Sequence, residues 1–179
     1  MRKSLVVLAI IAATSISGAA LADVQERKFS VGVSSYATSV DFPQGTDDAS
    51  GIGLTATAVF NTLGVGHLGL MANYAAMEHD QVNAIDVTNF DASLIWGKNL
   101  ATEGFKFYVG GGFFSEKWEA GNLLNETFSG AQLTGGIGYN FDRIALDLFV
   151  TARPGSGYKF QGTEADGAAT AGLSISYRF

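Results

Sequence analysis

The chain has 179 residues, with 17 acidic and 11 basic side chains and a formal net charge of −6 at pH 7. This acidic balance excludes a nucleic-acid-binding protein that relies on a basic surface. The absence of cysteine excludes disulfides, thiolate metal sites and a cysteine-linked lipid anchor. There are 23 glycines and 2 prolines, and no Pro-rich or charged linker divides the sequence, so its length predicts a single folded domain.

Residues 1–22 have the pattern of a cleavable signal peptide. Met1-Arg2-Lys3 is followed by a short apolar run, and Ala20-Leu21-Ala22 has the small residues of a signal-peptidase site. We predict cleavage after Ala22, which leaves residues 23–179 as the mature barrel domain. Cleavage would remove two basic residues and no acidic ones, so the mature chain would be more acidic still.

Eight segments of the mature chain alternate apolar and polar residues with period two, which is typical of β-strands. No apolar run is long enough for a transmembrane helix, so a closed barrel is the remaining way to cross a bilayer with every backbone group paired. The predicted strands are 27–37, 51–61, 65–77, 89–97, 105–116, 129–140, 144–153 and 167–179.

The connections between these strands alternate in length. Three are short, at 61–64, 98–104 and 141–143. Four are longer and polar, at 38–50, 78–88, 117–128 and 154–166. Together these features predict an all-β fold, an eight-stranded antiparallel up-and-down transmembrane β-barrel with short periplasmic turns, four longer external loops and both termini in the periplasm.

One face of the predicted strands carries no charged residue. A Lys or Arg facing lipid near the bilayer midplane costs roughly 2–4 kcal/mol, so this face is expected to contact lipid. Its aromatic residues gather near the strand ends, as at the two interfaces of a bilayer. The expected periplasmic girdle is Phe29, Phe60, Trp96, Phe105, Phe107, Tyr139, Tyr177 and Phe179, and the expected outer girdle is Tyr74, Phe90, Phe113 and Phe128.

The opposite face is small and polar and carries charges of both signs. An eight-stranded barrel has an interior that side chains can fill, so these charges are expected to neutralise one another across the lumen. Arg153 is expected to pair with Glu116 or Asp91, and Asp147 with Arg178 or Lys106. The predicted lumen charge network is Lys28, Asp91, Lys106, Glu116, Asp147, Arg153 and Arg178.

The last segment of the chain carries the most specific motif. Apolar or aromatic residues occupy alternate positions up to a terminal phenylalanine: Leu173, Ile175, Tyr177 and Phe179. With the barrel pattern, this segment resembles the small eight-stranded outer-membrane proteins of the OmpX and OmpA barrel type. The resemblance implies the outer membrane of a Gram-negative bacterium, contact with its lipid and lipopolysaccharide, and a terminal strand that the barrel-assembly machinery recognises.

The predicted external loops are acidic. The simplest interpretation is a solvated, repulsive outer surface. An alternative is bridging by divalent cations to lipopolysaccharide phosphates, for which Asp47 and Asp48 are the best oxygen donors, although no loop has the spacing of a calcium motif.

Two of these loops also contain apolar residues. They are Trp118, Leu123 and Leu124 in the third loop and Tyr158 and Phe160 in the fourth. They could form an exposed contact patch for a host surface or matrix, or they could extend the barrel wall above the membrane.

Two other classes of function compete with this interpretation, an outer-membrane enzyme and a narrow solute channel. An outer-membrane enzyme of the lipid A deacylase or acyltransferase type needs a nucleophile with a positioned base, and the only histidines are His67, near a periplasmic turn, and His79, in the second outer loop. We interpret them as a lumen histidine and a solvated loop histidine, at opposite ends of the barrel, where they cannot share a metal ion. A narrow solute channel is opposed by bulky interior residues such as Tyr36, Tyr108, Phe114 and Phe149.

The sequence therefore predicts a monomeric outer-membrane barrel with a filled lumen and no catalytic residue, cofactor or metal. Its expected role is structural or adhesin-like, in envelope integrity or surface interaction through its loops, with no nucleic-acid partner.

Overall fold

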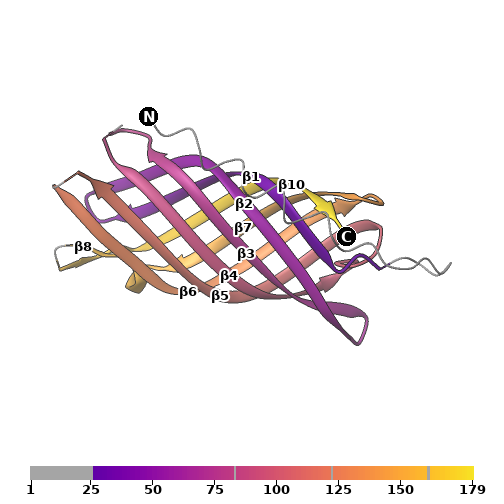
Figure 1. The fold of residues 1–179 in the computed structure, drawn as a ribbon. Coiled ribbons are helices and arrows are strands. Elements are labelled where there is room, and N and C mark those ends of the chain that lie inside the picture. Colours follow the sequence, from indigo (N-terminus) through magenta and orange to yellow (C-terminus); the bar gives the residue numbers. More distant parts are fainter. Residues whose placement is uncertain (1–25, 83, 122, 161) are drawn as a thin grey trace.

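The protein is a closed barrel of antiparallel strands. In the computed structural model, residues 26–179 are described except for 83, 122 and 161, so the predicted signal peptide at 1–22 lies outside the described residues. No helix among the described residues is long and apolar enough to cross a membrane. The barrel strands are β1 (Phe29–Phe42), β2 (Gly45–Leu63), β3 (Gly66–His79), β4 (Asp86–Lys98), β5 (Gly104–Ala120), β6 (Leu124–Asn140), β7 (Ile144–Pro154) and β10 (Gly167–Arg178) (Figure 1).

Each strand pairs with its neighbours in sequence, and the first strand closes the barrel by pairing with the last. The order around the barrel is β1-β10-β7-β6-β5-β4-β3-β2. The closing ladder runs from Ser30 opposite Arg178 to Asp41 opposite Gly167, and the Phe179 amide donates to the Phe29 carbonyl at 2.8 Å. The eight-stranded antiparallel fold predicted from the sequence is confirmed, and closure leaves no free edge along this seam.

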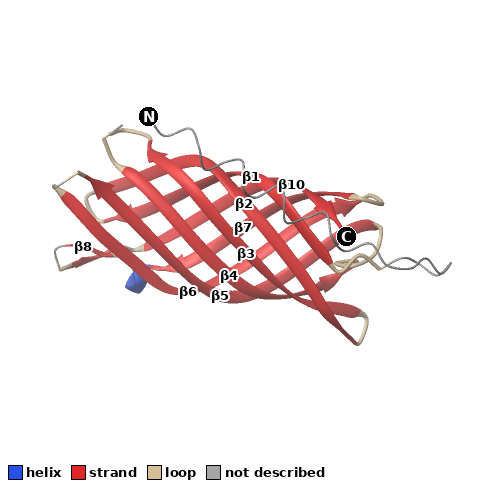
Figure 2. Ribbon diagram, in the orientation of Figure 1, coloured by secondary structure: helices blue, strands red, loops and turns tan. Residues whose placement is uncertain are grey.

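The two ends of the barrel differ. At one end, here called the terminal end, β1 begins and β10 finishes, and tight turns join the other strands (Figure 1). At the opposite end, here called the distal end, the connection from β7 to β10 carries one turn of 3-10 helix, η2 (Gly155–Gly157), and a small hairpin of β8 (Lys159–Phe160) and β9 (Thr163–Glu164). Apart from η2, the described chain is strands and short connections (Figure 2).

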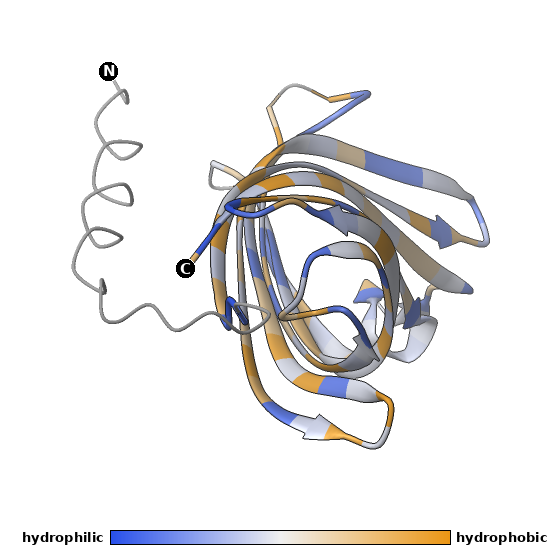
Figure 3. Cartoon of the chain, turned by 90° about the vertical axis from the view of Figure 1, so that its right-hand side faces the viewer, coloured by the Kyte–Doolittle hydropathy of each residue, from blue (hydrophilic) through white to orange (hydrophobic). Residues whose placement is uncertain are grey.

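Outward-facing side chains make a broad apolar band around the barrel. Successive residues of a strand point to opposite faces, so hydropathy alternates along each ribbon, as Figure 3 shows from the terminal end. The band includes Val31, Val33, Ile52, Leu54, Leu70, Leu94, Phe107, Val109, Ile137, Leu146, Leu148, Val150, Leu173 and Ile175, all of them exposed. An exposed apolar surface of this extent is unfavourable in water and is typical of a barrel surrounded by lipid.

Strand boundaries differ from the sequence prediction at the distal end. The segments 38–50 and 117–128 were predicted to be external loops, but most of their residues continue the strands, and β1 and β2 are joined through Pro43 and Gln44. The prediction was wrong here because acidic residues on the outer face of these strands made the segments resemble solvated loops. Phe128, predicted for an outer aromatic girdle, is instead buried inside the barrel.

Glycines in β5 allow the backbone of β4 to come close. A Cβ atom added at Gly112, on the inner face, would lie 1.8 Å from the Ala92 carbonyl oxygen, whereas one at Gly111, on the outer face, would lie 3.5 Å from its nearest neighbour, the Gln132 carbonyl oxygen. The first position therefore depends on glycine and the second does not.

We expect Gly112→Ala to lower the free energy of unfolding by about 1–3 kcal/mol, because the ladder between β4 and β5 must distort to admit the methyl group. Urea titration of the refolded protein, followed by the gel mobility of folded and unfolded forms, measures this change. Gly111→Ala is the matched control and should be close to neutral. Equal unfolding midpoints for the two variants would contradict this account of the barrel wall.

Candidate functional site

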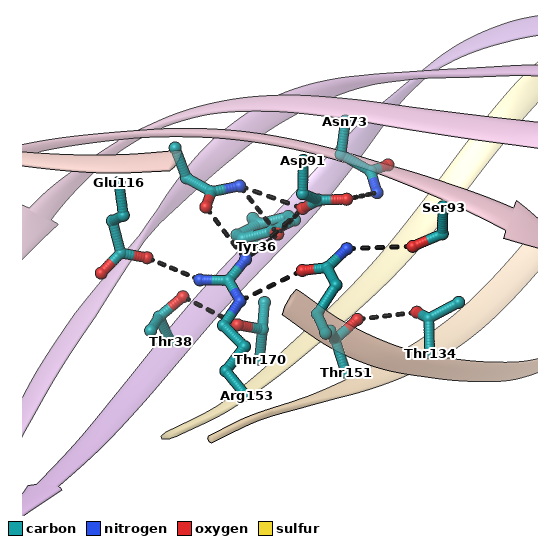
Figure 4. A network of polar contacts seen from close by, with 12 residues as sticks. Tyr36, Thr38, Asn73, Asp91, Ser93, Glu116, Thr134, Thr151, Arg153 and Thr170 are labelled. Carbon is teal, nitrogen blue, oxygen red and sulfur yellow. Dashed lines mark hydrogen bonds and ion pairs between the residues drawn. The ribbon is translucent and has the colours of Figure 1, made fainter. Parts of the chain in front are cut away.

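A buried arginine lies near the distal end of the lumen and contacts side chains from four other strands. Arg153, on β7, donates through Nη1 to Glu116 Oε2 at 2.8 Å and to the Tyr158 hydroxyl at 2.9 Å. Its Nη2 donates to Asn89 Oδ1 at 2.9 Å and lies 3.5 Å from Asp91 Oδ2. We call the residues in contact with this guanidinium the Arg153 network: Tyr36, Asn89, Asp91, Phe114, Glu116, Gln132 and Tyr158. Figure 4 shows Arg153 together with Tyr36, Asp91 and Glu116.

Hydrogen bonds from neutral donors stabilise the carboxylates of this network. Arg153 carries one positive charge against the two carboxylates of Asp91 and Glu116. Asp91 also accepts from the Tyr36 hydroxyl, from Asn73 Nδ2 at 2.9 Å and from Asn89 Nδ2 at 3.0 Å. A buried charge is tolerated when it is both paired and hydrogen-bonded, and these contacts supply both conditions.

A second ion pair lies closer to the terminal end. Lys106 Nζ is 2.8 Å from Asp147 Oδ2, and both side chains are largely buried. A cavity lined by these two residues, Tyr108 and Arg178 has a volume of about 20 Å³, which suits one water molecule. The lumen at the level of this ion pair therefore has room for little more than one water molecule.

Two members of the predicted lumen network do not pair with its carboxylates. Lys28 is exposed at the terminal end and pairs with Glu26 at 3.2 Å. Arg178 points inward at the terminal end, where it donates to the backbone carbonyls of Ala101 at 2.8 Å and Asp142 at 3.2 Å, and Asp147 pairs with Lys106 instead. The carbonyls of the terminal-end connections thus solvate a cation that the sequence suggested would need a carboxylate.

Beyond the Arg153 network, the barrel reverses its polarity. We call this part the distal collar, made of residues 38–50, 76–79, 86–88, 115–120 and 124–129. Its inner face is richer in apolar residues, with Val40, Ala49, Met77, Val87, Trp118 and Phe128 buried beside the polar Thr38, His79 and Glu116. Its outer face is polar, with Asp48, Ser50, Glu78, Asp86, Ser115, Glu119 and Thr127. A soluble barrel has this arrangement, so the collar is suited to water outside and an apolar interior.

Aromatic rings form the floor of the distal collar. Phe128 lies between Trp118 and Tyr158, with ring centroids 6.0 and 5.2 Å away, and Tyr158 stacks on Phe114 at 5.1 Å. Trp118 Nε1 donates to Glu116 Oε1 at 2.8 Å and so joins this floor to the Arg153 network.

Above this floor lies a cavity of about 630 Å³. Its walls include Phe42, Ile85, Leu124 and Phe160, which are partly buried against the core. We call this cavity the distal cup.

His79 lies at the edge of the distal cup and is buried, so the expectation of a solvated loop histidine was wrong. Its Nδ1 accepts from the backbone amides of Gln81 at 3.1 Å and Val82 at 3.2 Å. The proton of the ring therefore lies on Nε2, which is 3.3 Å from Asp47 Oδ1. His67 lies at the terminal end, so the two histidines are far apart along the barrel.

The predicted contact residues do not form one exposed patch. Trp118 and Tyr158 are buried and Leu124 and Phe160 are partly covered, which does not fit the alternative of an exposed contact patch. Leu123 is 95% exposed at the turn between β5 and β6. Asp47 and Asp48 are consecutive strand residues whose side chains point to opposite faces, and among the described residues no group of three or more acidic or histidine side chains could hold a metal ion.

The predicted assembly-signal residues lie on the outer face of β10. Leu173, Ile175 and Tyr177 are exposed in the apolar band. The Tyr177 hydroxyl accepts from Arg143 Nη1 at 2.8 Å, and its ring lies 5.0 Å from that of Phe179. These contacts order the terminal edge of the seam between β1 and β10.

Solved structures with this architecture are outer-membrane proteins. The chain superposes on Neisserial surface protein A with a TM-score of 0.60 and 13% identity, covering 84% of this chain and 97% of that one. It superposes on the attachment invasion locus protein of Yersinia pestis with a TM-score of 0.55 and 15% identity, covering 87% and 99%. The fold is that of the small outer-membrane barrels.

A third similar structure is the outer-membrane protein AlkL, determined in lipid bilayers, with a TM-score of 0.50, 14% identity and coverage of 92% and 95%. No protein-family model matches the sequence, and no curated protein matches it. The resemblance indicated by the terminal strand is thus confirmed at the level of the fold.

We expect Arg153→Met to lower the free energy of unfolding by about 3–5 kcal/mol, because it leaves the buried Asp91 and Glu116 carboxylates without their cation. Urea titration followed by gel mobility measures the loss. Arg143→Met is the control: that side chain is exposed at the terminal end, where water screens its contacts with Asp142 and the Tyr177 hydroxyl.

Adding Asp91→Asn and Glu116→Gln to Arg153→Met should recover part of the stability, since no buried carboxylate then remains in the network. If Arg153→Met lowered the free energy of unfolding no more than Arg143→Met, the Arg153 network would not contribute the stability proposed for it.

Proposed function

We propose that this protein is a closed, non-catalytic barrel of the Gram-negative outer membrane that acts through its distal end as a surface-interaction protein. The Arg153 network carries this proposal. It fills the lumen with buried charged and aromatic side chains, while the strands continue beyond it into the distal collar. A barrel that is closed inside and extended at one end is suited to presenting a surface, and poorly suited to conduction.

Membrane insertion gives the two ends their proposed locations. The terminal end, with its tight connections, would face the periplasm, and the distal collar would face the cell exterior. Leu173, Ile175, Tyr177 and Phe179 would serve as the signal that the barrel-assembly machinery recognises. The names of two similar structures, an attachment invasion locus protein and a surface protein, agree with a role at the cell surface.

The enzyme and channel alternatives have less support. The described histidines lie at opposite ends of the barrel, and His79 is engaged with backbone amides and Asp47, so neither is positioned as a base beside a nucleophile. A channel would require an aqueous path past the buried Tyr36, Phe149 and Arg153.

We expect the refolded protein to give no steady current of porin size in a planar lipid bilayer, because the Arg153 network and the pair of Lys106 and Asp147 both obstruct the lumen. A porin reconstituted in the same way provides the positive control. Steady open currents of comparable size would overturn the closed-barrel part of the proposal.

The surface-interaction part is tested with cells that display the protein on plates coated with extracellular matrix. Leu123 and Val65 form a matched pair, because both are exposed apolar residues of turns, 95% and 89% accessible, at opposite ends of the barrel. We expect the protein to increase cell retention, Leu123→Ser to reduce it, and Val65→Ser to leave it unchanged. Equal retention with and without the protein would contradict the role.

A further inference from the structure

The distal cup has the features of a small-molecule site that a surface-adhesion role does not require. Its volume of about 630 Å³ lies within the roughly 300–1,000 Å³ typical of ligand pockets. Its lining combines apolar side chains, among them Phe42, Ile85 and Leu124, with polar ones such as Gln44, Gln81 and Thr163, and the rings of Trp118 and Phe128 form its floor. The apolar side chains of this lining are poorly hydrated, so the cup favours an occupant with an apolar body that displaces water from them.

The charged side chains that line the cup determine which polar group an occupant should carry. Asp47 and Glu126 contribute carboxylates to the lining, which contains no lysine or arginine among the described residues. Glu126 lies directly across the ladder from Trp118 and makes no hydrogen bond or ion pair with any described residue. Its charge is therefore available to a ligand.

The neighbouring groups do not neutralise these carboxylates. His79 accepts two backbone amides at Nδ1, so the ring is the neutral tautomer and offers Asp47 a hydrogen bond without a positive charge. The lysines of the distal end are already paired: Lys117 with Glu119 at 2.7 Å, and Lys159 with Glu164 at 3.4 Å. The cup thus combines apolar and neutral polar side chains with two carboxylates that no lysine or arginine among the described lining residues neutralises.

We propose that the distal cup binds an amphipathic organic cation, with its apolar body against Phe42, Ile85, Leu124 and Phe160 and its cationic group beside Asp47 and Glu126. Charge complementarity identifies this occupant over a neutral or anionic amphiphile. The aromatic floor adds cation–π attraction near Trp118. The site goes beyond the proposed surface role and does not depend on a macromolecular partner.

Trp118 supplies a direct measurement. The chain contains two tryptophans, and the other, Trp96, lies in the exposed apolar band, so a Trp96→Phe background leaves Trp118 as the single fluorophore. The protein is refolded into phosphatidylcholine vesicles and titrated with octyltrimethylammonium, octyl sulfate or octanol. We expect a saturable change in Trp118 emission with the cation, at a concentration at least about tenfold below that needed for the sulfate or the alcohol.

Two double variants with the same change in net charge separate the cup from general electrostatics. Asp47→Asn with Glu126→Gln removes both lining carboxylates and should weaken binding of octyltrimethylammonium about tenfold or more while leaving octanol unaffected. Asp48→Asn with Glu78→Gln removes two carboxylates from the outer face of β2 and β3 and should leave cation binding unchanged.

The gel mobility of each variant reports whether it is folded. If the first double variant does not fold, Glu126→Gln alone decides, because that side chain makes no hydrogen bond or ion pair with the described part of the chain. Equal affinity for the cation and the sulfate would overturn the proposal, as would unsaturable emission changes or unchanged cation binding after Glu126→Gln. A conducting barrel or a failed adhesion assay would count against the proposed function and leave this site untouched.

Discussion

The burial of Arg153 is the interaction on which the interior of this barrel depends. A guanidinium removed from water needs its charge and its donors satisfied, and here strands β1, β4, β5 and β6 each contribute a polar side chain to it. Because these partners come from strands far apart in the sequence, the network can form only when the barrel is closed. The contacts of this one side chain therefore depend on the register of the whole sheet. The hydrogen bond between Glu116 and Trp118 extends the network to the distal collar.

The network also marks the boundary between two environments. On the terminal side, apolar residues face outward and the lumen is polar, as a bilayer demands. On the distal side, the same strands place apolar residues inward and acidic residues outward, as water demands. The strands pass from one zone into the other with their alternation in phase, and the register shift in β2, between Val59 and Asn61, lies near the terminal end. The reversal therefore results from the choice of side chains. Val33 and Val40 on β1 illustrate it, since the first is exposed and the second is buried.

This reversal explains what could be predicted from the sequence and what could not. The eight strands and the closed fold follow from period-two alternation with one uncharged face, which is a local pattern. The collar was missed because acidic residues such as Asp48 and Glu119 suggested loops, although Trp118 stands in phase with Phe114 and Glu116 and could have signalled a continuing strand. The carbonyls that solvate Arg178 and the amides that fix His79 are backbone groups, and they leave no trace in side-chain patterning.

Strand β6 extends further toward the distal end than its neighbour β7. Its ladder with β7 ends at Leu133 opposite Ala152, yet the strand continues back to Leu124, paired with β5 alone among the described residues. The η2 turn lies against part of this margin, with Gly157 close to Ser129 and Gly130. The collar is thus an open sheet on that flank, and main-chain amides along it are shielded by a turn instead of a strand. Hydrogen exchange should divide the molecule accordingly, with slow amides where the cylinder is complete and fast ones along this margin.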